Sequence, residues 1–224
     1  MKLNGQISVG SKIIMTIKYK LTTIFCLICV LVITSIDPIY PTEQFLQHIG
    51  TFLLGVILIS DLRMNFLSTA SFCGVAFFTL IHIIGARYIY SYVPYNEWSI
   101  SITGFDLNAF FDTKRNHYDR FVHFSFGLVM IPICIQIVEL MKLRSRNATI
   151  FMAWLMIQTG SMIYELFEWL LTIIVSSEAA NNYNGQQGDV WDAQKDMALA
   201  LVGSTLSALF ALAFRKKQKN IRFK

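Results

Sequence analysis

Six long apolar stretches constrain this chain more than any other feature. A helix needs about 20 apolar residues to cross a hydrocarbon core about 30 Å thick. The stretches reach or approach this length, the second being the shortest, and they cover residues 19–36, 45–60, 66–86, 121–141, 149–176 and 197–214. Only 15% of the residues are charged, against about 25% in a typical soluble domain. The sequence therefore predicts an all-α polytopic membrane helix bundle with six transmembrane helices.

The distribution of Lys and Arg predicts the orientation, because positive residues in short loops are retained in the cytoplasm. Basic residues gather in the first 20 residues, after the second and fourth stretches and in the tail, whereas the loop around Pro38 and residues 175–194 have none. We expect both termini in the cytoplasm, with a cytoplasmic arm (1–18), a six-span membrane domain (19–214) and a basic cytoplasmic tail (215–224). Segment 87–120 is expected outside despite its four basic residues, because long loops translocate with less regard to charge.

Ionisable residues gather at the ends of the spans that are predicted to face outward. Such groups are rare at membrane depth, where they pair with one another or line a functional cavity. Spacings of three or four residues place Asp119 with His123, Glu165 with Glu168, and Asp192 with Asp196 on common helix faces. The sequence therefore predicts an outward-facing polar pocket among the third to sixth spans.

Roles for the pocket residues follow from their chemistry. Carboxylates and imidazoles on the inward faces of a helix bundle form divalent metal sites. The expected metal ligands are Asp189, Asp192, Asp196, His123 and Glu165, the expected catalytic residues are Glu165, Glu168, His117, Asp119 and His123, and the expected substrate-binding residues are Arg87, Arg115, Arg120 and His82. A structural network, in which the arginines and Lys195 neutralise the acids, stays open as the alternative.

Four motifs carry a family resemblance. They are His82–Tyr88 (HIIGARY), Arg115–Phe124 (RNHYDRFVHF), Tyr164–Trp169 (YELFEW) and Gly188–Met197 (GDVWDAQKDM). These motifs closely resemble the YjdF family of uncharacterised bacterial inner-membrane proteins. The resemblance implies a multi-pass protein of the bacterial inner membrane and names no activity.

A fainter similarity is to VanZ-like membrane proteins, which are linked to glycopeptide antibiotic resistance. The residues that carry it are Asp119, His123, Phe124, Glu165, Asp192, Asp196 and Gly203. The chain departs from that pattern at Glu168, where the VanZ-like proteins have Gln.

Three functions fit the predicted pocket. The first is a metal-assisted hydrolase or transferase acting on a lipid-linked envelope substrate, and the second is non-catalytic binding of an envelope precursor or antibiotic. A small proton-coupled transporter ranks last, because the sequence shows no inverted repeat and no broken helix pair. The expected partners are the lipid bilayer and a lipid-linked or amphipathic small molecule, and a divalent metal is the one cofactor that the residues suggest. No Gly-rich phosphate loop or nucleic-acid-binding module is visible.

Overall fold

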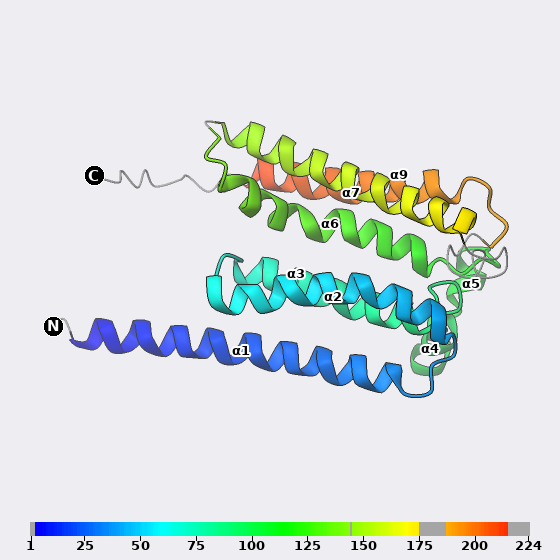
Figure 1. Cartoon of the computed structure of the whole chain (residues 1–224), viewed down its shortest axis with the longest axis horizontal. Coiled ribbons are helices and arrows are strands. Elements are labelled where there is room, and N and C mark those ends of the chain that lie inside the picture. The colour runs from blue at the N-terminus through cyan, green and yellow to red at the C-terminus, as the bar shows by residue number, and fades with distance from the viewer. Residues whose placement is uncertain (1–2, 144, 175–186, 215–224) are drawn as a thin grey trace.

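The computed structural model describes residues 3–143, 145–174 and 187–214, and every regular element within them is a helix. Figure 1 shows long helices running side by side, with two short ones at one end of the bundle. The helices are α1 (Leu3–Ser35), α2 (Pro41–Met64), α3 (Thr69–Arg87), α4 (Tyr95–Thr103), α5 (Leu107–Phe110), α6 (Tyr118–Glu139), α7 (Arg146–Ile174) and α9 (Asp192–Ala213).

Six of these helices are long and apolar enough to cross a membrane: α1 from Ile17 onward, α2, α3, α6, α7 and α9. The prediction of an all-α bundle with six spans is therefore confirmed. α1 begins and α9 ends at the same end of the bundle (Figure 1), as six crossings require. Which side that end faces stays a prediction. Residues 3–18, the predicted arm, continue the first span as one helix, and the predicted tail lies outside the described residues.

Several helices begin earlier than the predicted spans, whereas α3 begins later, at Thr69 rather than residue 66. α2 begins at Pro41 rather than residue 45, α6 at Tyr118 rather than 121, and α9 at Asp192 rather than 197. The added first turns contain polar residues, which a count of apolar residues omits. Proline suits a first turn because its missing N–H has no helical partner there, and carboxylates are stabilised near a helix N-terminus.

The spans form two groups that meet along the centre of the bundle. α1, α2 and α3 lie together, as do α6, α7 and α9, and α3 contacts α6 between the groups (Figure 1). Within the protein, 61% of the α3 span and 56% of the α6 span are buried, against 6% of the α1 span. α3 and α6 are therefore the central helices, whereas α1 lies at the edge.

Two glycines let α6 and α9 approach at backbone distance. A β-carbon on Gly127 of α6 would collide with the carbonyl oxygen of Ala200, and one on Gly203 of α9 would collide with the carbonyl oxygen of Phe124. Small residues allow such close packing between membrane helices. The nearest atoms at both contacts belong to the backbone, which cannot move aside as a flexible side chain can.

A buried ion pair fixes α1 to the turn between α2 and α3. Lys20 Nζ lies 2.6 Å from Asp61 Oδ2 and donates to Asn65 Oδ1 at 2.8 Å, and the Leu67 N–H donates to Asp61 Oδ1 at 2.7 Å. The Lys20 and Asp61 side chains are 3% and 0% exposed. The ammonium also lies 5.4 Å from the centroid of the Phe72 ring. Both charges thus have nearby partners that offset the cost of burial.

The glycine contact makes Gly127→Ala a test of the α6–α9 packing. The added methyl group has to displace backbone, so we expect a loss of about 1–3 kcal/mol in the free energy of unfolding. The measurement is reversible unfolding in mixed micelles. Gly55→Ala in α2 is the control, because no atom lies within 4 Å of a β-carbon there. Equal effects of the two substitutions would contradict the packing argument.

The Lys20–Asp61 pair gives a second prediction. Lys20→Met leaves a buried carboxylate without its cation, at an expected cost of about 3–5 kcal/mol in the free energy of unfolding. The double variant Lys20→Met/Asp61→Asn removes both charges, and we expect it to recover most of that loss. Lys18→Met is the control, since the Lys18 side chain is exposed. A double variant as unstable as Lys20→Met alone would show that the pairing of charges is not what stabilises this turn.

Candidate functional site

A cluster of buried ionisable side chains lies where α6, α7 and α9 meet. Asp119 and His123 stand one turn apart at the start of α6, Asp196 lies in the second turn of α9, and Glu165 lies on α7. One ligand atom from each of Asp119, His123 and Asp196 lies within 4.8 Å of the other two. His123 Nε2 is 3.6 Å from Asp119 Oδ1 and 3.5 Å from Glu165 Oε1. All four side chains are buried.

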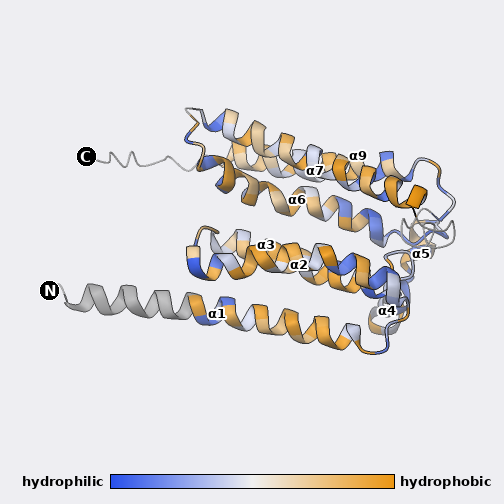
Figure 2. Cartoon of the chain, in the orientation of Figure 1, coloured by the Kyte–Doolittle hydropathy of each residue, from blue (hydrophilic) through white to orange (hydrophobic). Residues whose placement is uncertain are grey.

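The helix periodicity explains why these groups meet. His123 stands four residues before Gly127, and Asp196 stands seven residues before Gly203, so each polar residue shares a helix face with a glycine of the close contact. The backbone contact between α6 and α9 therefore brings the imidazole and the carboxylate together. Figure 2 shows the same arrangement as a hydrophilic section at the beginning of α6, in an otherwise largely apolar half of the bundle.

Several carboxylate oxygens in this region have no hydrogen-bond partner among the described residues. They are Glu165 Oε1, Asp192 Oδ2 and Asp196 Oδ1. A buried polar atom without a partner is costly, and such exceptions in a native structure call for an explanation, of which a bound water or ion is one kind. These carboxylate oxygens are the kind of atom to which a cation would bind.

A second layer of ion pairs lies next to the cluster. Arg115 contacts Asp192 Oδ1 at 2.5 Å, and Arg120 contacts Asp189 Oδ2 at 2.6 Å. Lys195 also contacts Asp189 Oδ2 at 2.6 Å. The hydrogen bond from Lys195, with a smaller contribution from Arg120, lowers the pKa of Asp189 to about 2. Asp189 and Asp192, which the sequence suggested as metal ligands, are thus already matched to cations.

The other predicted site residues are distributed around the cluster or away from it. His117 Nε2 lies 2.9 Å from Thr113 Oγ1, and burial, followed by the charges of Arg120 and Arg115, lowers its pKa. Glu168 is half-buried on α7 and interacts with the Tyr164 hydroxyl.

The remaining two lie at the helix ends of the other half of the bundle. Arg87 donates to the backbone carbonyls of Thr34, Ile36 and Asp37, which ties down the end of α1. His82 is buried, contacts the Gln47 carbonyl oxygen at 3.0 Å and forms a short hydrogen bond with the Tyr90 hydroxyl. The structure therefore brings Asp119, His123, Glu165 and Asp196 together, and it leaves Arg87 and His117 outside that group.

An apolar cavity of about 250 Å³ lies beside the cluster. Asp119, His123, Ser161 and Tyr164 contribute to its wall, and the remaining lining is mainly apolar. Gly50, Leu53 and Leu54 bring α2 into this wall. Apart from Tyr90, the described lining residues of this cavity come from the second to fifth spans and none comes from the sixth, whereas the prediction was a pocket among the third to sixth spans. The cavity is also less polar than expected. Hydropathy could not show the contribution of α2, because the α2 residues concerned look like lipid-facing ones.

Sequence comparison identifies the family. The model of the family described as Predicted membrane protein (DUF2238) matches residues 19–217, which include every residue of the cluster. The chain belongs to this family. The inner membrane protein YjdF of Escherichia coli (strain K12) is 27% identical over 198 residues, which cover 88% of this chain and 90% of that protein.

This result confirms the resemblance to the YjdF family. Together with the six spanning helices, it makes the chain a multi-pass inner-membrane protein. No solved structure matches the chain. The VanZ-like similarity is not tested by these comparisons and stays a prediction.

Proposed function

We propose that this DUF2238 protein is a metal-assisted hydrolase or transferase that acts on a lipid-linked substrate. The observation that carries the proposal is the grouping of Asp119, His123 and Asp196, whose ligand atoms lie within 4.8 Å of one another while all three side chains are buried. Glu165 stands beside them through its contact with His123.

The chemistry of the three side chains suits a divalent ion. In a tetrahedral zinc site with bond lengths near 2.0–2.2 Å, the ligand atoms lie about 3.4 Å from one another, so the three side chains would have to draw together by up to about 1.4 Å to hold the ion. Carboxylate oxygens with one imidazole are ligands that Mn²⁺ and Zn²⁺ both accept. The unpartnered oxygen of Asp196 gives the ion a place to bind. A bound ion would polarise a substrate oxygen and lower the pKa of a bound water.

The cavity supports a substrate with a lipid portion. Its apolar wall reaches Asp119 and His123, so a hydrocarbon chain held there places its attached polar group at the cluster. Glu165 stands beside His123, and its Oε1, 3.5 Å from His123 Nε2, makes no hydrogen bond with the described residues. A carboxylate oxygen in this position suits a group that takes a proton from the attacking water. Binding of an anionic headgroup by Arg115 or Arg120 stays part of the proposal.

The ion pairs favour a second candidate, which is binding of an envelope component without turnover. Arg115 and Arg120 already contact Asp192 and Asp189, so an anionic substrate would have to displace a carboxylate from one of them. A component that is bound only in the apolar cavity, away from these arginines, needs no such exchange. Transport is less supported, because each spanning helix is continuous within the described residues, whereas many transporters use broken helices at the binding site.

Metal binding by the purified full-length protein tests the ion site. With Mn²⁺ and Zn²⁺ as probes in titration calorimetry, we expect about one equivalent to bind the unaltered protein. Asp196→Asn and His123→Ala are expected to weaken binding by about 100-fold or more, since loss of a ligand should exceed the 10–100-fold seen for outer-shell partners. Asp189→Asn is the matched control, because that carboxylate belongs to the ion pairs. Undetectable binding, or equal losses in Asp189→Asn and Asp196→Asn, would refute the assignment.

Turnover separates the two candidate functions. Metal-loaded protein is incubated with a radiolabelled bacterial lipid extract, and release of a water-soluble product is measured. We expect release that stops on chelation and is lost in Glu165→Gln while metal binding is retained. If the protein binds labelled lipid but releases no water-soluble product, the enzyme proposal is wrong and the binding function is supported.

A further inference from the structure

The hairpin formed by α4 and α5 exposes large apolar side chains. Ile102, Phe110 and Phe111 are 81%, 67% and 65% exposed, and Phe105 and Trp98 are also exposed. The rings are contiguous, with centroids 5.3 Å apart between Phe105 and Phe110 and 5.0 Å apart between Phe110 and Phe111. An exposed apolar patch of this kind marks an interaction surface.

Internal hydrogen bonds hold the hairpin in one shape. Ser99 Oγ donates to the Phe105 carbonyl at 2.8 Å, and the Asn108 N–H donates to Asn96 Oδ1 at 3.0 Å. The His117 N–H donates to Tyr95 Oη at 3.1 Å, which joins the hairpin to the start of α6. The aromatic side chains are therefore presented on an ordered support at a defined place.

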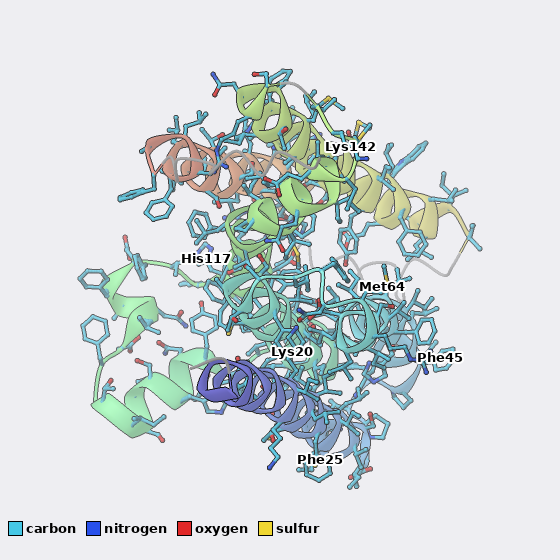
Figure 3. All side chains as sticks on the ribbon, turned by 90° about the vertical axis from the view of Figure 1, so that its left-hand side faces the viewer. Lys20, Phe25, Phe45, Met64, His117 and Lys142 are labelled. Atoms are coloured by element: carbon cyan, nitrogen blue, oxygen red, sulfur yellow. The ribbon has the colours of Figure 1, made fainter. Side chains whose placement is uncertain are left out.

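The hairpin lies beside the bundle rather than over it. Figure 1 places α4 and α5 at the end of the spans where α6 begins. Figure 3 looks along the spans, and there α4 and α5 stand to the side of the bundle, outward from His117. A segment that projects sideways at the end of a membrane-spanning bundle extends over the surface of the bilayer.

The hairpin and α6 line one mainly apolar cavity of about 610 Å³. Leu107 and Phe111 from the hairpin and Phe121 from α6 contribute to its wall, together with His117. Phe121 lies on α6 within a membrane span and is 45% exposed. The hairpin and the span therefore share one apolar surface.

We infer that the α4–α5 hairpin is embedded in the interface of the adjoining leaflet, with Ile102 and Phe110 among the phospholipid acyl chains. An interfacial segment buries its apolar side about 5–10 Å into the boundary between headgroups and chains. Residues 95–113 contain Glu97, Asp106 and Asp112 and no Lys or Arg, so attraction to anionic headgroups does not hold the hairpin there. A neutral phospholipid is sufficient, and salt does not release the hairpin.

Cysteine reactivity tests this placement in the full-length protein. Ile102→Cys and Phe110→Cys are compared with Glu97→Cys and Lys114→Cys, which replace exposed charged residues of the same region. Each variant is reconstituted in phosphatidylcholine vesicles and treated with a membrane-impermeant maleimide at low and high salt. Mass spectrometry of the labelled peptide separates the new thiol from the four native cysteines. Comparison within one region cancels the effect of mixed insertion orientation.

We expect the thiols at positions 102 and 110 to react at least about tenfold more slowly than those at 97 and 114, at both salt concentrations, because the reagent does not enter the acyl region. Similar rates at all four positions would place the hairpin in water and overturn the inference. Protection that disappears as the protein is diluted with lipid would assign the surface to a second copy of the chain, which also overturns it.

Discussion

The backbone contact between α6 and α9 is the constraint on which the site depends. Lipid supplies little hydrophobic driving force between helices, so their association relies on close packing, and Gly127 and Gly203 permit the closest approach on these two helices. The same faces carry His123 and Asp196. The same packing therefore joins the two helices and brings ionisable groups together. Repulsion between the carboxylates and the cost of burying them oppose the association of α6 with α9. A bound cation would turn that opposition into attraction.

Much of the fold could be predicted from the sequence because hydropathy and helix length determine it. The six spans follow from apolar length alone, and the spacing of Asp119 with His123 already indicated a shared face. The first turns of α2, α6 and α9 were missed because they contain polar residues, of which Gln44, Asp119 and Asp192 are buried within the protein. Nothing in the hydropathy distinguishes Lys20 and Asp61, 41 positions apart, as partners. That pairing depends on how α1 packs against the turn after α2.

The sequence predicted which residues gather in the site better than it predicted what each of them contacts. Proximity of Asp119, Glu165 and Asp196 follows from their common depth, but depth cannot show which acid meets an arginine. Arg115 and Arg120 reach Asp192 and Asp189, which precede or begin α9, whereas Asp196 lies one turn deeper. Asp192, which pairs with Arg115, and Asp196, which forms no ion pair with an arginine among the described residues, are thus only one helical turn apart. Sequence spacing alone does not determine which of the two is paired, because the turn before α9 sets the register.

The position of the hairpin gives the deeper cluster a route to the membrane surface. Asp119 is the second residue of α6, and the hairpin joins that helix through the bond between His117 and Tyr95. If the hairpin lies in the leaflet interface as proposed, a lipid beside it would have its headgroup near the level at which α6 and α9 begin. In the proposed function its hydrocarbon chain would pass from the leaflet into the apolar cavity beside the cluster. Because the chain would exchange one apolar environment for another, the arrangement would avoid the cost of extracting it into water, about 0.8 kcal/mol per CH₂.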